Sequence, residues 1–557
     1  MGGNNSRYLD DRMSDRDDQQ SGHSHPRRSL RSRSRDSNTD GDIPSIVELL
    51  IQSGQIHFIN QDIGNSDSSL SEEEFVAPPA RAPKIDLNPD VRQIQKNDIH
   101  SLVMTSSGRL SDSQWLSYLK PTVPNMIIKR EVGLNMQQQF THGDMCVMGS
   151  RFLPNHRTRL DVYNQKAFCG IYSDDGNVFL SACQDQHIRV YNTSDDNKFK
   201  LFRSIRARDV GWSVLDTAFS PDGQYVAYSS WSDCIHLCSI HGDYDIHEAL
   251  QFDPGDHSFC IFSLMFSSDN KEILGGANDG HLYVYDRELN KRTLKIDAHD
   301  YDVNTVRFAD TSSQILYSGG DDGLCKVWDR RALREERPVP VGILAGHGDG
   351  ITYIDSKGDA RYFVSNCKDQ TLKLWDIRHF SNQDGIEETK KVVSSQRWDY
   401  RWQQVPRRMA KKRALKGDTS VMTYRGHCVL HTLIRCKFSP EASTGQRYIY
   451  TGCATGSVVV YDLLTGKVVR KLSGHKSCVR DVSWHPYKNN IISTSWDGKL
   501  LRWTYKNSDI ESSEEEEYPR ICQVTETSRF GTRASYRERA IPPVLPTKEM
   551  PFLGLFD

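Results

Sequence analysis

The central part of the chain repeats one pattern of apolar and polar positions. An apolar strand is followed by a turn, a Ser-small-x-Asp segment and an alternating strand that closes on an aromatic residue. Three complete copies begin at Ser318, Ser365 and Ser493. In each of them an aspartate stands six residues before a tryptophan, in the pairs Asp322 and Trp328, Asp369 and Trp375, and Asp497 and Trp503.

Four looser copies keep this spacing. Three of them are Asp185 with Tyr191, Asp233 with Ser239, and Asp279 with Tyr285, while the fourth, Thr451 to Tyr461, has Thr455 in the aspartate position. The seven copies run from about Gln165 to Tyr505 and average about 42 residues once the insertion 379–426 is set aside, which is the length of one four-stranded blade. The sequence therefore predicts an all-β, seven-bladed β-propeller within residues 140–505.

A histidine stands upstream of several copies, before an alternating strand. A buried polar network explains its position: the turn aspartate fixes the histidine, the histidine meets the strand serine, and the serine meets the indole N–H. We therefore expect these histidines to be structural, not catalytic. Three complete tetrads are predicted: His299, Ser318, Asp322 and Trp328; His347, Ser365, Asp369 and Trp375; and His475, Ser493, Asp497 and Trp503.

The last copy lacks an outer strand, because the chain turns acidic at Glu511–Glu517 soon after the third strand. A closed ring needs its fourth strand from elsewhere, since an unpaired edge invites aggregation. We expect that strand upstream, within Phe140–Leu153.

The regions outside the repeats differ in character. Residues 1–42 are polar and are expected to be disordered, as is the acidic tail 506–557. Residues 43–125 predict short helices and linkers: an apolar helix at 43–53, a second helix at 88–108, and a third at 112–119.

Composition narrows the function classes. A net charge of -2 gives no nucleic-acid footprint, and no apolar run is long enough for a membrane span. The thirteen cysteines, without a leader-like apolar segment, indicate an intracellular chain with reduced thiols. Cys234 and Cys238 have no second cysteine pair, so we expect no metal site. The sequence also has no catalytic motif, so we expect no cofactor and no enzyme activity.

Three short motifs leave alternatives open. Met1–Ser6 fits the myristoylation pattern at Gly2, which with downstream arginines would give only a weak membrane-associated pool. The tract Arg27–Arg35 is typical of a solvated tail, a nuclear-import signal or an RNA-binding segment. The basic run Arg407–Lys416 fits a nuclear-import signal, a face for an acidic partner or an ordinary solvated loop equally.

The repeats resemble the WD-repeat family, over roughly 60% of the chain. Two neighbouring copies end alike, in Trp328-Asp329-Arg330-Arg331 and Trp375-Asp376-Ile377-Arg378. This Trp-Asp-x-Arg ending resembles the box of substrate receptors of cullin-4 RING ubiquitin ligases. The resemblance implies that Asp329, Arg331, Asp376 and Arg378 bind the damaged-DNA-binding protein 1 adaptor. Trp398-Asp399-Tyr400-Arg401 spells the same pattern inside the insertion, but no strand precedes it.

Longer runs narrow the resemblance to the WD repeat-containing protein 23 type of receptor. They are Gln165–Ser173, Ala207–Asp216, Arg397–Pro406 and Tyr424–His427. The resemblance implies a non-enzymatic subunit of the nucleus and cytoplasm that brings protein targets, such as stress-response bZIP transcription factors, to the ligase without requiring nucleic acid. It also implies that the helix at 43–53, and that at 88–108, dock the adaptor. The alternative is a generic WD-repeat scaffold in a nuclear RNA-processing complex.

Overall fold

The computed structural model describes residues 80–507, except 82, 110–121, 134–138, 196–198, 243–245, 253–258 and 410–413. All of them belong to one compact unit. The predictions for the tail 1–42, Gly2, the helices at 43–53 and 112–119, and nearly all of the acidic tail 506–557 lie outside the described residues.

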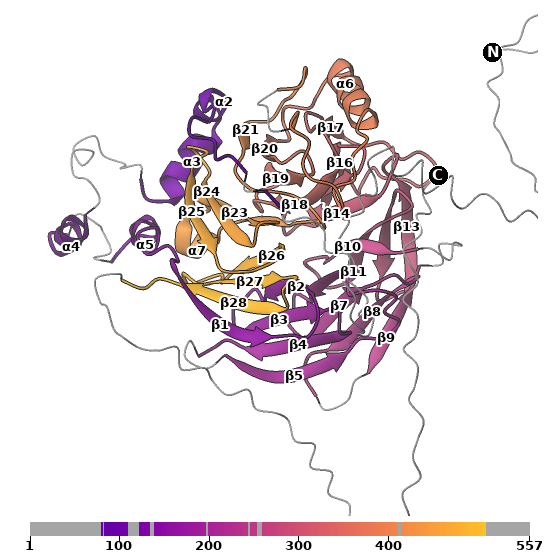
Figure 1. Cartoon of the computed structure of the whole chain (residues 1–557), viewed down its shortest axis with the longest axis horizontal. Coiled ribbons are helices and arrows are strands. Elements are labelled where there is room, and N and C mark those ends of the chain that lie inside the picture. The colour runs from indigo at the N-terminus through magenta and orange to yellow at the C-terminus, as the bar shows by residue number, and fades with distance from the viewer. Residues whose placement is uncertain are drawn as a thin grey trace, which may run out of the picture. The chain divides into compact units, whose positions relative to one another are not determined.

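Seven four-stranded antiparallel sheets form a ring (Figure 1), which confirms the predicted seven-bladed propeller. Blade one contains β2 (Ala167–Tyr172), β3 (Val178–Cys183), β4 (His187–Asn192) and β5 (Lys200–Arg206). Blade two contains β6 (Asp216–Phe219), β7 (Tyr225–Ser229), β8 (Cys234–Ser239) and β9 (His247–Gln251). Blade three contains β10 (Ile261–Phe266), β11 (Glu272–Ala277), β12 (His281–Asp286) and β13 (Lys291–Asp297).

The remaining blades follow the same order. Blade four contains β14 (Val303–Phe308), β15 (Ile315–Gly320), β16 (Cys325–Asp329) and β17 (Gly342–Leu344). Blade five contains β18 (Ile351–Ser356), β19 (Tyr362–Cys367), β20 (Leu372–Asp376) and β21 (Met422–Tyr424). Blade six contains β22 (Cys436–Phe438), β23 (Tyr448–Cys453), β24 (Ser457–Asp462) and β25 (Val468–Ser473). Blade seven contains β26 (Val479–Trp484), β27 (Ile491–Ser495) and β28 (Lys499–Thr504), and its fourth strand is β1 (His156–Val162).

Burial explains the sequence pattern of the strands. The second and third strands are almost wholly buried, because apolar side chains of both faces pack against neighbouring blades. Outer strands such as β5 are largely exposed. The first strands lie nearest the axis of the ring, as β10, β14 and β18 do in Figure 1.

Buried charges join these inner strands. The Arg435 guanidinium lies 2.5 Å from Asp216 and 3.0 Å from Asp481, and Asp481 also accepts from Lys437. Burial opposes ionisation of Asp481, but the two cations outweigh it and hold its pKa below the ordinary value. Paired in this way, the charges link blades two, six and seven without an uncompensated buried ion.

The ring closes through an upstream strand, although not at the predicted place. β1 pairs antiparallel with β28, from His156 opposite Thr504 to Val162 opposite Lys499. Phe140–Leu153 was the wrong segment, because most of it forms α5 (His142–Gly149). A capping box between Thr141 and Asp144 starts that helix by satisfying backbone N–H groups at its first turn.

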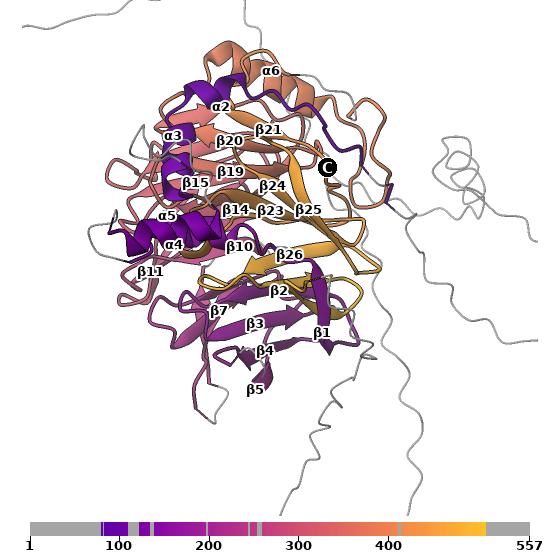
Figure 2. The same ribbon diagram turned by 90° about the vertical axis from the view of Figure 1, so that its left-hand side faces the viewer.

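The predicted helix 88–108 is two helices, α2 (Arg92–Lys96) and α3 (Ile99–Ser106), broken at Asn97 and Asp98. Ile94, Ile99 and Val103 are fully buried in a cluster with apolar side chains of blades five and six. Figures 1 and 2 show α2, α3 and α5 along this rim of the ring. The propeller therefore covers these three side chains, whereas Leu102 on α3 is 45% exposed.

Close backbone contact holds α3 beside α5. A side chain at Gly108, which has φ +69°, would collide with the carbonyl oxygen of Gly143. The Cys146 thiol of α5 in turn lies 3.7 Å from the carbonyl oxygen of Glu441, the first residue of α7 (Glu441–Thr444). A further helix, α4 (Val123–Glu131), precedes α5, and no helix in the described ranges has the length and apolar character to cross a bilayer.

The insertion ends earlier than 426, because β21 (Met422–Tyr424) pairs with β20 and completes blade five. The inserted segment thus separates the third and fourth strands of one blade. It contains α6 (Gln383–Ser394), whose Val393 lies against the Gly323 turn of blade four.

Closure gives the first testable prediction. A chain that begins at Gln165 lacks β1, whereas one that begins at Phe152 keeps it. Because only the former leaves β28 with an open edge, we expect it to aggregate and the longer chain to elute as a monomer in size-exclusion chromatography. Equal monomer yields from the two chains would contradict the closing role of β1.

Candidate functional site

The three predicted tetrads are joined by hydrogen bonds in blades four, five and seven. In blade four, His299 Nδ1 lies 2.9 Å from Asp322, His299 Nε2 lies 2.7 Å from Ser318 Oγ, and the Trp328 indole donates to the same oxygen at 2.9 Å. His347 and His475 repeat the arrangement, with histidine–serine distances of 2.7 and 2.8 Å. These distances fit a ring that bonds to the aspartate through Nδ1 and to the serine hydroxyl through Nε2.

The tetrads connect the loop before one blade to the second and third strands of that blade. All three histidine side chains are fully buried, so no tetrad histidine faces solvent. Burial opposes ionisation of Asp497, but the hydrogen bonds from His475 and from backbone N–H groups hold its pKa at about 2. The tetrads therefore lock the blade geometry and offer no reactive group.

The looser copies replace the tetrad with other bonds. In blade one, Asp185 binds Arg189 of its own β4, and in blade three Asp279 accepts from the Tyr283 hydroxyl. In blade six, His427 bridges the Tyr461 hydroxyl and the Asn366 side chain, and burial lowers its pKa to about 4. The aspartate spacing thus marks the turn even where the histidine partner is missing.

Blade two departs from the predicted match by one residue. Val226 pairs with Cys238, as Leu316 pairs with Trp328, so Cys238 and not Ser239 stands in the tryptophan position. By the same register Ser232, not Asp233, stands in the aspartate position. The sequence match was one residue out because Ser232 has no carboxylate and Cys238 has no indole, the groups by which the pattern is recognised.

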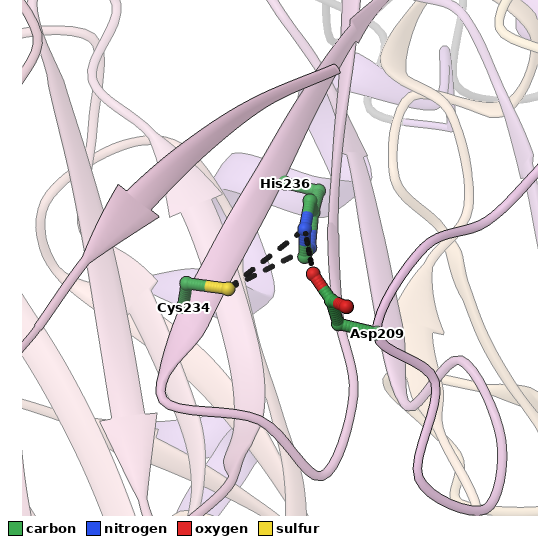
Figure 3. Close-up of side chains that lie close together, drawn as sticks. All are labelled: Asp209, Cys234 and His236. Carbon is green, nitrogen blue, oxygen red and sulfur yellow. Dashed lines mark hydrogen bonds and ion pairs between the residues drawn. The ribbon is translucent and has the colours of Figure 1, made fainter.

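Asp209, Cys234 and His236 gather at this blade (Figure 3) and include donor types that bind zinc. His236 Nε2 lies 2.9 Å from Asp209, but the Cys234 sulfur is 3.8 Å from both ring nitrogens. The direct bond of His236 to Asp209 corresponds to the histidine–aspartate bonds of the three tetrads. We interpret the group as the blade-two counterpart of the tetrad, with the aspartate supplied by the preceding loop.

The two Asp-x-Arg turns have the same internal geometry. Arg331 places Nε 2.9 Å and Nη2 2.7 Å from the Asp329 carboxylate. Arg378 places Nε 3.0 Å and Nη2 2.7 Å from Asp376. Both aspartates end the third strand of their blades, so both turns lie on the same face of the ring. Each fork uses Nε and Nη2 and leaves Nη1 outside it.

The surroundings of the two turns differ. In blade five the α2–α3 junction covers the turn: Asn97 donates to Asp376 at 2.9 Å, and Asp98 lies 3.2 Å from Arg378 Nη1. In blade four, within the described residues, the Arg331 side chain bonds only to Asp329 and is 69% exposed. The sequence did not indicate that Asn97 and Asp98 contact Asp376 and Arg378. Its only sign of this junction was the polar break between two apolar runs.

The insertion copy of the motif lies on the opposite face. Arg401 forks onto Asp399 as the other arginines do, at 3.0 and 2.7 Å. Nearby, the Trp398 indole donates to Asp349 at 2.9 Å, and the His431 backbone donates to Tyr400. Asp349 and His431 lie in loops that precede first strands, which is the face opposite the ends of the third strands. In the basic run 407–416, Arg408 binds the Gln396 side chain.

A known family of repeats matches four stretches of this chain. The "WD domain, G-beta repeat" family model matches residues 150–192, 290–329, 338–376 and 466–504. The last three ranges hold the three tetrads.

Similar proteins cover more of the chain. The DDB1- and CUL4-associated factor 11 homolog of Caenorhabditis elegans is 44% identical over 67% of this chain and 66% of its own length. That of Caenorhabditis briggsae is 41% identical over 67% of this chain and 70% of its own length. The LEC14B protein of Lithospermum erythrorhizon is 40% identical over 80% of this chain and 93% of its own length. The chain thus spans about two thirds of the length of the first of these relatives.

The tetrads predict a stability that depends on pH. Asp497→Asn should destabilise the protein at pH 7 by about 1 kcal/mol, allowing for solvent screening. Since the folded pKa of Asp497 is lowered, its contribution is complete above about pH 4 and is lost as the pH falls toward 2. Urea unfolding of wild type and variant should therefore differ at pH 7 and converge only as the pH falls to about 2 and below. A difference that is independent of pH would contradict the ionised tetrad.

Proposed function

Because this chain belongs to the WD-repeat family of the DDB1- and CUL4-associated factor 11 homologues, we propose that it is a substrate receptor of a cullin-4 RING ubiquitin ligase. The name of those relatives states an association with the damaged-DNA-binding protein 1 adaptor and cullin-4, and the similarity to them supports the same association here. In this role the chain binds and positions proteins and catalyses no reaction itself.

The Asp-x-Arg turns of blades four and five carry the docking part of the proposal. Each arginine is fixed by its own aspartate, so little side-chain entropy is lost when a partner binds. A guanidinium held in this way offers planar, charge-assisted donors to a carboxylate or carbonyl oxygen. The two turns lie on neighbouring blades of one face, which suits a single partner surface.

The face of the ring opposite the Asp-x-Arg turns is the one that we assign to the protein target of the ligase. There the insertion crosses the loops of blades five and six, and it exposes Trp402, with 54% of its surface accessible. Tyr301, in the loop before blade four, is 58% exposed on the same face. Exposed aromatic side chains on a rigid frame are typical anchors of protein interfaces. We propose that protein targets, with stress-response bZIP transcription factors as the class to examine, bind here in the nucleus and cytoplasm.

Reconstitution tests the docking. The full-length chain should co-elute with purified adaptor and cullin-4, and the double variant Arg331→Glu/Arg378→Glu should not, because charge reversal places carboxylates where donors are needed. Arg401→Glu is the matched control, since Arg401 has the same fork on the other face. Retention of adaptor and cullin by the double variant would contradict docking through these turns.

The RNA-processing alternative makes a different prediction. A scaffold of that kind would retain RNA, and the retained amount would fall steeply as salt is raised. We expect the purified full-length chain to bind RNA no better than bovine serum albumin at 150 mM salt, a concentration of about physiological ionic strength. Salt-sensitive RNA retention, together with no adaptor binding, would favour the alternative.

A further inference from the structure

The Asp-x-Arg turn of blade five is bonded to another segment of the same chain, the junction between α2 and α3. Asn97, between α2 and α3, donates to the fully buried Asp376 carboxylate and accepts from the Tyr362 hydroxyl at 2.7 Å. The next residue, Asp98, reaches the Nη1 atom of Arg378 that the internal fork leaves over. An Asn-Asp pair at the start of a helix thus satisfies both members of the turn.

Two further contacts secure the junction. Asp98 also lies 2.6 Å from Arg361, and the Ser106 hydroxyl at the end of α3 donates to the Gly445 carbonyl at 2.7 Å. The ion pairs of Asp98 are partly exposed and contribute little alone. The bond of Asn97 to the buried Asp376 carboxylate adds an acceptor contact to the fork from Arg378 and fixes where the junction sits on the blade.

The blade-four turn presents the same fork without that cover. Asp329 is 19% exposed and Asp376 is not exposed at all, while Arg331 is 69% exposed and Arg378 is 46% exposed. In the pairing with the third strand, Ile315 stands where Tyr362 stands in blade five. The loop that follows Asp329 exposes Val339 and Val341, at 61% and 56%. The open turn therefore combines a guanidinium edge with apolar surface.

We propose that the two turns have different tasks: the blade-five turn anchors the α2–α3 pair, and the blade-four turn binds an acidic side chain at the start of a helix of the ligase adaptor. The adaptor part of this inference rests on the proposed function. The contact of Asp98 with Arg378 Nη1 shows how the adaptor carboxylate would bind. A carboxylate in the same position at Arg331 Nη1 would meet the same fork of arginine and aspartate. Arg378 is then a positioning residue, and Arg331 is the residue that touches the partner.

Single variants of the full-length chain separate these tasks. Two measurements are made on each: affinity for the purified adaptor, and hydrogen exchange of the peptides that cover α2 and α3. Arg331→Ala should weaken adaptor binding about tenfold and leave exchange unchanged. Arg378→Ala and Asn97→Ala should speed exchange of α2 and α3 about tenfold but weaken adaptor binding less than about threefold. Arg401→Ala should change neither quantity.

The possible results are distinct. If Arg378→Ala weakens adaptor binding as much as Arg331→Ala and leaves exchange unchanged, both turns face the adaptor and the division of tasks is wrong. If the unsubstituted chain does not bind adaptor, the proposed function fails, and with it the assigned task of Arg331. The exchange measurements still decide the anchoring task in that case, because faster exchange in Arg378→Ala alone supports it and equal exchange overturns it.

Discussion

The pairing of β1 with β28 is the constraint on which the rest of the structure depends. One blade is assembled from both ends of the repeat region, so each of the seven blades has four strands and the two ends of the repeat region are held together. The same pairing ties the segment before β1 to the ring. The helices α2, α3 and α5 lie beside blades five and six, where α2 and α3 bury their apolar side chains.

Within the closed ring, polar networks decide which loops are rigid. The tetrads of blades four and five bind the loop before each blade to its second and third strands. Those same third strands end in Asp329 and Asp376. An arginine two residues beyond a locked strand end has a defined position, which is what recognition by a single guanidinium needs. The structural tetrads and the proposed docking turns are thus two ends of the same strands.

The sequence predicts most of what is periodic and little of what is not. The tetrads of blades four, five and seven were visible because four polar residue types recur at fixed spacing. The closing strand was misplaced because β1, with the sequence His-Arg-Thr-Arg-Leu-Asp-Val, is mostly exposed and has no apolar alternation. Blade two was matched one residue out of register because Ser232 and Cys238 carry no side chain typical of those positions.

The contact of Asn97 with Asp376 could not be predicted for another reason. The two residues are 279 positions apart, and nothing in a local pattern shows which distant surface covers a short helix. The Asp-x-Arg turns themselves could be predicted, but their inequality depends on this contact. From the sequence alone the two arginines are equivalent, whereas in the structure Arg378 is bonded to the α2–α3 junction and 46% exposed, and Arg331 is 69% exposed.

Photo-crosslinking measures directly which face of the ring meets the ligase adaptor. A photoreactive amino acid is placed at Val339, beside the open turn, or at Trp402 on the opposite face, in the full-length chain with adaptor and cullin-4 present. Docking through the open turn predicts an adaptor crosslink from position 339 and none from position 402. Adaptor crosslinks from position 402 alone would contradict it.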